Sequence, residues 1–182
     1  MLQSSTRLQR CGPTVVLLVH LQYRFFHRLS DAGQERISQP LMRLLQECAS
    51  HDVPVVALAI SGSGDIRYEF LREIKRVPRH CIVRHAGRDG FADTILDREL
   101  ERLDAGPIVL GGIYASECVF ANAKSAHHHG HPLHTSEVFL ADRSSDSVDK
   151  HFVGWFRQHG TYHMDYVSPL AIRAYPSLHI EK

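Results

Sequence analysis

The chain has 182 residues, of which 43% are hydrophobic and 23% charged, values typical of a globular protein with a full core. Its formal net charge of +1 gives no electrostatic basis for binding nucleic acid or an anionic membrane. The longest apolar run, Val15 to Val19, is far too short to cross a bilayer. These values predict a single domain over residues 1–182, with no nucleic-acid partner and no membrane partner.

Cysteine usage and the N-terminus both indicate a reducing compartment. The four cysteines (Cys11, Cys48, Cys81 and Cys118) lie far apart and form no CxxC pair, which argues against a zinc ribbon or a disulfide scaffold. Residues 1–13 form a polar arm that lacks the apolar segment of a signal peptide. We therefore expect a cytoplasmic protein.

Taken in chain order, the hydrophobic pattern predicts strands that alternate with helices. Strands are expected at residues 14–19, 54–60, 81–84, 107–111, 133–140 and 162–167. A polar loop through Gln34 follows the first strand, and helices are expected at residues 35–51, 67–75, just after Phe91 (carrying Ile95 and Leu96), 116–129, 148–156 and near Pro169. This order predicts a doubly wound α/β fold with a mainly parallel six-stranded sheet and helices on both faces.

The segment from Gly111 to Cys118 joins the fourth strand to the next helix. The apolar run is expected to break at the two glycines, and Ser116 then opens a helix with Cys118 in its first turn. Unpaired N–H groups and the positive helix end favour thiolate over thiol there, and the same N–H groups could hold an oxyanion. The alternative is that Cys118 is only a small buried residue.

Polar residues follow three of the predicted strands. His20 follows the first, Arg84 and His85 end the third, and Cys118 follows the fourth. Ligands of such sheets bind beyond the carboxyl ends of the strands, where the strand order reverses. A thiol beside an imidazole is the minimal apparatus for nucleophilic attack on an acyl carbon, so these residues are candidates for catalysis.

Histidine is unusually frequent, with 14 residues and a dense run over residues 127–134. One interpretation of the run is metal binding. The other is a polar helix end before Gly130 and Pro132, where histidines lie near the negative pole of the helix. We favour the helix end, because neighbouring histidines on a helix point in different directions.

With these features assembled, the chain resembles the isochorismatase-like superfamily of cysteine hydrolases over about residues 15–169. His20-Leu21-Gln22 stands where the family has Asp-x-Gln, and the stretch from Arg84-His85 to Phe91 is similar to its lysine loop. The stretch from Gly111-Gly112 to Cys118-Val119 resembles the nucleophile motif, and Asp142 stands where an acidic residue often follows the fifth strand.

The resemblance implies hydrolysis of a C–N bond in a small amide, urea or carbamoyl compound by a Cys–Asp–Lys triad, without a cofactor. By position the nucleophile is Cys118, the aspartate is replaced by His20, and the lysine is replaced by His85 or by its neighbour Arg84. Neutral imidazole is a competent base near pH 7, so His20 could pair with Cys118. Glu117 acts the other way, because a nearby negative charge disfavours the thiolate.

The resemblance also implies a pocket for a small-molecule substrate and a homodimer or larger homo-oligomer. Gln22, Phe91, Tyr114 and Ala115 are expected to shape this pocket, with a non-proline cis peptide near Tyr114–Ala115. Arg88 or Arg24 is a candidate for selecting an anionic substrate, although charged loop residues are usually solvated.

Two other activities of the family are disfavoured. Nicotinamidase-like members carry an Asp-x-His metal cluster after the second strand, where this chain has residues 61–65 without histidine, so we expect no metal. Vinyl-ether hydrolysis uses the aspartate that His20 replaces.

Two functions therefore remain open. The first is a hydrolase that forms an acyl-enzyme at Cys118 with His20 as base, or a related acyltransferase that differs only in its acceptor. The second is a catalytically decayed member that serves as a binding or structural subunit, and it predicts a buried Cys118 whose pKa is raised.

Overall fold

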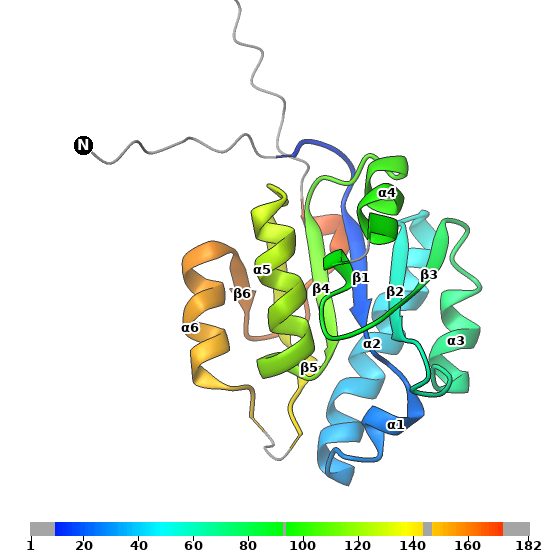
Figure 1. The fold of residues 1–182 in the computed structure, drawn as a ribbon, viewed down its shortest axis with the longest axis vertical. Coiled ribbons are helices and arrows are strands. Elements are labelled where there is room, and N and C mark those ends of the chain that lie inside the picture. Colours follow the sequence, from blue (N-terminus) through cyan, green and yellow to red (C-terminus); the bar gives the residue numbers. More distant parts are fainter. Residues whose placement is uncertain (1–9, 93, 144–146, 173–182) are drawn as a thin grey trace, which may run out of the picture.

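In the computed structural model, which describes residues 10–92, 94–143 and 147–172, six strands form one sheet in the order β3-β2-β1-β4-β5-β6 (Figure 1). All five strand pairs are parallel. The strands are β1 (Val15–Val19), β2 (Val55–Ile60), β3 (His80–His85), β4 (Ile108–Ile113), β5 (Leu133–Ala141) and β6 (Thr161–His163). The strand order reverses between β1 and β4, which confirms the doubly wound fold and places its ligand crevice beyond the ends of these two strands.

Helices cover both faces of the sheet (Figure 1). One layer contains α1 (Tyr23–Phe26), α2 (Asp31–His51) and α3 (Tyr68–Ile74). The other contains α4 (Thr94–Arg102), α5 (Phe120–His128) and α6 (Lys150–His159). Shorter turns are η1 (Gly90–Ala92), η2 (Ala115–Val119) and η3 (Pro169–Ala171).

β1 shows why the central strands are apolar throughout. Val16 and Leu18 pack against the layer of α2 and α3, whereas Val15, Leu17 and Val19 pack against the layer of α4, α5 and α6. All five side chains are completely buried. A strand covered on both faces needs apolar residues at every position, which is the pattern that the sequence shows.

β4 differs from its prediction, because it continues through both glycines to Ile113 instead of breaking at them. Gly112 has φ 129°, and a Cβ on it would lie 2.1 Å from the carbonyl oxygen of Val19. The glycine is therefore required by the close approach of β4 to the end of β1 and does not mark a turn.

Several helix boundaries also differ. α2 begins at Asp31, four residues before the predicted position 35, because the Ser30 hydroxyl caps it by accepting the Gly33 N–H at 3.0 Å. The predicted loop before it contains the short helix α1. The predicted helix 116–129 is a turn of π-helix, η2, followed by α5. Of the two residues named for the helix after Phe91, Leu96 is completely buried and Ile95 is 51% exposed.

β6 has only three residues, Thr161–His163, where six were predicted. The following backbone leaves the ladder, and the Asp165 carbonyl instead accepts a hydrogen bond from the Ser136 hydroxyl. Of the predicted N-terminal arm, residues 1–9 lie outside the described residues, and the extent of the domain over residues 1–182 stays a prediction. Within the described residues, no helix combines the length and the apolar character needed to cross a membrane.

Candidate active site

The residues predicted from three strand ends gather at one edge of the sheet. His20 directly follows β1, His85 ends β3, and Cys118 lies in η2 just beyond β4. Val19 pairs in register with both Leu58 of β2 and Gly112 of β4, so these strand ends are level. The edge is the one at which a doubly wound sheet binds its ligand.

His20 and His85 form a buried pair. Their Nε2 atoms lie 2.9 Å apart, a hydrogen-bond distance, and the rings stack with centroids 5.0 Å apart at 23°. The His20 backbone has φ 54°, a left-handed conformation that is uncommon for residues other than glycine and often marks a functional site. Burial, together with the nearby His85, lowers the pKa of His20 to about 3, so its ring is neutral at pH 7.

The second ring nitrogen of His20, Nδ1, takes no part in the hydrogen bond to His85. This atom is buried and finds no hydrogen-bond partner among the described residues. When His20 donates its Nε2–H to His85, Nδ1 carries a lone pair that faces no donor. Buried polar atoms are normally satisfied, so an unsatisfied nitrogen at this edge of the sheet is a candidate proton acceptor.

Cys118 lies near the end of η2 and is 4% exposed. Burial raises the pKa of its thiol, and the neighbouring Glu117 carboxylate raises it further. A backbone hydrogen bond with Tyr114 and the charges of Arg88 and Arg143 oppose these effects but do not outweigh them. The expected stabilisation of a thiolate by the helix start is therefore wrong: loss of hydration dominates at this position.

Phe25 and Tyr114 join the histidine pair to the thiol-bearing turn. The Phe25 ring stacks on His20 with centroids 5.5 Å apart and meets the Tyr114 ring edge-on at 6.0 Å. The Tyr114 hydroxyl donates to the Phe25 carbonyl at 3.0 Å, and the Tyr114 carbonyl accepts the N–H groups of Glu117 and Val119. A non-proline cis peptide is present, at Ile113–Tyr114, one bond before the expected position.

Arg84 and His85, the two candidates for the lysine position, point in different directions, as neighbours on a strand do. The Arg84 side chain is 52% exposed and pairs with Asp65 at 3.3 Å, on the surface. His85 is 2% exposed and contacts His20. The structure thus brings His85, but not Arg84, to His20.

The residues predicted to shape a pocket are largely used in packing. The Gln22 amide donates to the carbonyls of Ile60 and Gly64, and its oxygen accepts the Ile60 N–H, so it ties the loop after β1 to the end of β2. Phe91 is 8% exposed, and Ala115 is completely buried. Both belong to the core cluster that contains Cys118.

Asn122 and Arg143 were missed in the sequence. Asn122 is completely buried, and its amide donates to the carbonyls of Cys118 (2.8 Å) and Arg88 (3.0 Å) while its oxygen accepts the Gly90 N–H at 2.9 Å. It thereby fixes the loop after β3 to the nucleophile turn. An asparagine four residues after Cys118, inside a buried helical stripe, is the signal that could have indicated it. Arg143 carried no such signal, since it lies in a polar loop.

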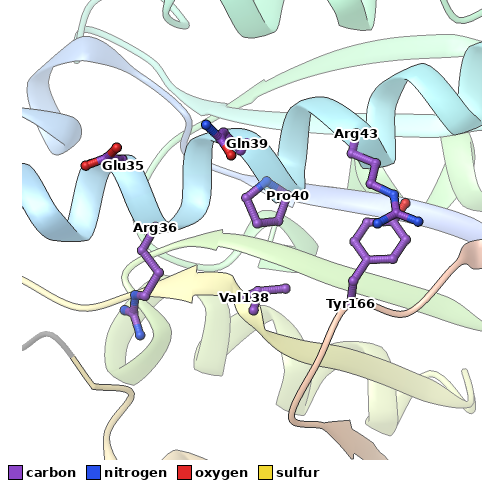
Figure 2. Close-up of a pocket in the computed structure, with 7 residues that line it drawn as sticks. All are labelled: Glu35, Arg36, Gln39, Pro40, Arg43, Val138 and Tyr166. Carbon is purple, nitrogen blue, oxygen red and sulfur yellow. The ribbon is translucent and has the colours of Figure 1, made fainter.

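Neither of two cavities on the described residues is lined by Cys118, His20 or His85. The larger, of about 530 Å³, lies beside α2, where Figure 2 shows Pro40 directed toward Val138 and Arg43 reaching over the Tyr166 ring. The smaller, of about 390 Å³, lies beside the thiol-bearing turn and includes Ser116, Glu117, Asp142 and Arg143. Asp142, the predicted acidic residue, accepts the Ser116 N–H and hydroxyl there, at 2.9 and 2.8 Å.

The histidine run forms a helix end, as predicted. α5 ends at His128, and Gly130 follows with φ 84°. The side chains diverge: His127 packs on Trp155, His129 pairs with Asp97 at 3.2 Å, and His131 bonds to the Gly106 carbonyl. Within the described residues, no group of three or more His, Cys, Asp or Glu side chains is arranged to hold a metal ion.

The chain is thus a doubly wound α/β domain with a thiol after β4 and a polar pair after β1 and β3. A family model described as the isochorismatase domain matches residues 14–165. The chain therefore belongs to the isochorismatase family. A search of curated proteins finds no match.

Solved structures with the same fold include hydrolases of several specificities. The N-carbamoylsarcosine amidase from Thermoplasma acidophilum superposes with a TM-score of 0.70 at 21% identity, covering 84% of this chain and 96% of that one. The nicotinamidase SaPncA from Staphylococcus aureus gives 0.68 at 18% identity, covering 84% and 99%. The YcaC product from Escherichia coli, described as an octameric hydrolase of unknown specificity, gives 0.69 at 14% identity, covering 89% and 79%. At these identities, the similarity shows the fold alone.

Proposed function

We propose that this protein hydrolyses the C–N bond of a small amide or carbamoyl compound through an acyl-enzyme on Cys118, with His20 as the base. The observation that carries the proposal is the His20 ring, whose Nε2 is hydrogen-bonded to His85 while its buried Nδ1 has no partner among the described residues. A base oriented by a third group beside a nucleophile is the general arrangement for covalent catalysis.

Proton transfer accompanies the attack in this mechanism. The raised thiol pKa and the lowered imidazole pKa keep both Cys118 and His20 neutral at rest, so no ion pair forms beforehand. As the sulfur bonds to the substrate carbon, the thiol proton passes to His20 Nδ1, and His85 holds the other side of the ring.

The imidazolium then acts as the general acid in the next step. Its proton goes to the leaving nitrogen as the C–N bond breaks, and an amine or ammonia departs. Water then attacks the thioester at Cys118 and passes a proton to the neutral His20. The C–S bond breaks, His20 returns the proton to the Cys118 sulfur, and the carboxylic or carbamic acid is released. An amine in place of this water would give acyl transfer.

The catalytically decayed alternative is favoured by one specific observation. It expects a buried thiol with a raised pKa, and Cys118 is 4% exposed with its pKa raised by burial. In that case the chain would retain the fold as a binding or structural subunit. The two functions differ in whether Cys118 becomes acylated.

The test is to incubate the protein with a panel of small amides, carbamoyl compounds and thioesters and to follow both product release and intact mass after acid quench. We expect at least one compound to be turned over with an acyl mass added at Cys118, and both signals to disappear in Cys118→Ala. The decayed alternative is correct if nothing acylates Cys118 and iodoacetamide labels it more slowly than the exposed Cys11, with no change in His20→Ala.

The resemblance to the isochorismatase-like family also supports a homo-oligomer. Tyr23 and Tyr68, two large side chains that are 42% and 66% exposed, lie together on the surface of α1 and α3, where the Tyr23 hydroxyl accepts the Tyr68 N–H at 3.1 Å. We propose a homodimer or larger assembly, which sedimentation equilibrium would show as a mass that is a multiple of the chain mass. A monomer at all concentrations would contradict it.

A further inference from the structure

Three charged side chains from separate segments meet beside the nucleophile. Arg88 comes from the loop after β3, Glu117 precedes Cys118 in η2, and Arg143 follows β5. Arg88 Nη2 lies 3.6 Å from one carboxylate oxygen of Glu117, and Arg143 Nη2 lies 3.2 Å from the other. One carboxylate thus bridges two guanidinium groups, each through a different oxygen.

Both arginines are held in fixed relation to the thiol-bearing turn. The Arg88 carbonyl accepts a hydrogen bond from Asn122, whose amide also donates to the Cys118 carbonyl. The Arg143 guanidinium lies over the Tyr114 ring, 4.9 Å from its centroid, a cation–π contact. Both charges are close enough to Cys118 to lower the pKa of its thiol, although burial and Glu117 outweigh them.

The cations are accessible, whereas the carboxylate between them is more covered. The side chains of Arg88 and Arg143 are 70% and 48% exposed, and that of Glu117 is 26% exposed. The trio carries a net charge of +1, and ion pairs this exposed are weak, so an incoming anion can displace the Glu117 carboxylate. Guanidinium groups suit this exchange, because they bind carboxylates through paired N–H groups.

The cavity of about 390 Å³ beside Glu117 and Arg143 has room for such a group. Its other two carboxylates are already used: Asp142 accepts hydrogen bonds from Ser116, and Asp149 accepts the N–H groups of His151 and Phe152 at the start of α6. Glu117 is therefore the carboxylate on this cavity that is paired with arginines.

We propose that Arg88 and Arg143 form a carboxylate-binding subsite, occupied by Glu117 in the free protein, which selects anionic substrates for reaction at Cys118. The substrate class is a small amide or carbamoyl compound that bears a carboxylate, and the carboxylate takes the place of Glu117. The identification of this class depends on the proposed function of Cys118.

Iodoacetate and iodoacetamide test the subsite, because they alkylate thiols by the same reaction and differ in carrying a carboxylate or a neutral amide. The measured quantity is the ratio of their rate constants at Cys118, obtained by peptide mass spectrometry, relative to the same ratio at the exposed Cys11 in the same molecule. We expect the rate constant for iodoacetate divided by that for iodoacetamide to be about tenfold higher at Cys118 than at Cys11. This is the factor expected from one charge-assisted contact between the carboxylate and an arginine.

Substitutions separate the contributions. Arg88→Gln and Arg143→Gln should each reduce the ratio about threefold and together bring it to the Cys11 value. Glu117→Gln should raise the ratio, because the competing carboxylate is gone. Arg102→Gln is the matched control, since Arg102 also forms an exposed ion pair, with Glu99 on α4, and should leave the ratio unchanged.

The outcomes distinguish the two proposals. If Cys118 reacts with both reagents and the ratio equals that of Cys11 in every variant, the subsite is wrong and the hydrolase proposal stands. If Cys118 reacts with neither reagent, the acylation test described above decides the hydrolase proposal, and calorimetric titration with succinate and with succinamide decides the subsite. Heat with succinate alone, lost in the double arginine variant, supports the subsite, and its absence overturns it.

Discussion

Two histidine pairs in this molecule both stack and both contain an imidazole with a lowered pKa, but they lie at different positions in the sheet. His20 and His85 stack at the carboxyl ends of β1 and β3, and His134 and His163 stack on β5 and β6, with centroids 5.9 Å apart at 19°. Burial lowers the pKa of His20 to about 3 and that of His134 to about 4. A buried imidazole with a lowered pKa is therefore not sufficient to mark a catalytic base.

Location and hydrogen bonding distinguish the pairs. His134 is the second residue of β5, at the end of the sheet opposite to the thiol, whereas His20 lies beyond the end of β1. His20 and His85 also share a hydrogen bond at 2.9 Å, whereas the contact described between His134 and His163 is ring stacking. We call them the site pair and the distal pair, and the following substitutions test whether this difference is functional.

The largest expected effect is on reactivity. His20→Ala in the site pair should slow acylation of Cys118 by roughly 10²- to 10⁴-fold, the usual contribution of a general base. His134→Ala in the distal pair, a matched change, should alter it less than about twofold. Rates of acyl-mass appearance in single turnover measure both. Equal loss in the two variants would show that the effect is structural and does not depend on a base.

The next effect concerns the glycines that bring backbone close to each pair. A Cβ on Gly112 would lie 2.1 Å from the Val19 carbonyl oxygen, just before His20, at φ 129°. A Cβ on Gly160 would lie 2.8 Å from the Leu133 carbonyl oxygen, just before His134. Gly112→Ala should lower the free energy of unfolding by more than about 3 kcal/mol, because both the contact and the left-handed backbone are strained.

Gly160→Ala should cost less, roughly 1–3 kcal/mol, since its backbone is extended and only the contact is strained. Urea denaturation of both variants measures the difference. A larger loss at Gly160 would mean that the sheet tolerates distortion better near the site pair than near the distal pair.

A shared effect is expected on acid stability. The unfolded chain regains imidazole pKa values near 6.5, so below that pH it binds protons that the folded protein excludes, and stability falls. The fall continues until the pH reaches the folded pKa, about 3 for His20 and about 4 for His134. Between pH 7 and pH 5, each of these two histidines should lower the free energy of unfolding by roughly 2 kcal/mol.

His20→Phe and His134→Phe should therefore each flatten the pH dependence by about that amount, as measured by urea denaturation at the two pH values. His20 and His134 should behave alike in this test, because burial is the main cause of the lowered pKa in both, with a smaller contribution from the neighbouring imidazole. A change confined to one variant would show that the other histidine is protonated in the folded protein.

The smallest effect on stability is expected for His163, the member of the distal pair that lies on the edge strand β6. His163→Phe keeps an aromatic ring against His134 and should change the free energy of unfolding by less than about 0.5 kcal/mol, with no change in Cys118 labelling. His85→Phe in the site pair removes the partner of His20 Nε2 and should slow labelling by iodoacetamide. If His163→Phe slowed labelling equally, the hydrogen bond would not be what distinguishes the site pair.

The sequence predicted the alternation of strands and helices because apolar runs and helical stripes record burial directly. It misplaced the end of β4, since Gly111-Gly112 looks like a turn unless the neighbouring strand is known. The early start of α2 depends on the Ser30 cap, and the shortness of β6 depends on a bond between Ser136 and Asp165.

The candidate site was predicted in part. Strand ends indicated His20, His85 and Cys118, because the topology brings all carboxyl ends to one edge. The thiol pKa was predicted in the wrong direction, because the sequence does not show how completely η2 is buried. The ion pairs of Glu117 with Arg88 and Arg143 join segments that are far apart in the chain. The spacing of these residues in the sequence therefore did not indicate them.

The raised pKa of Cys118 also bears on how this protein meets oxidants. Peroxide attacks thiolates far faster than thiols, and here both burial and the Glu117 charge keep sulfur protonated. We expect Cys118 to resist conversion to sulfenic acid at concentrations of hydrogen peroxide that oxidise a low-pKa nucleophile. A thiol that stays protonated between turnovers would therefore remain reduced at those peroxide concentrations.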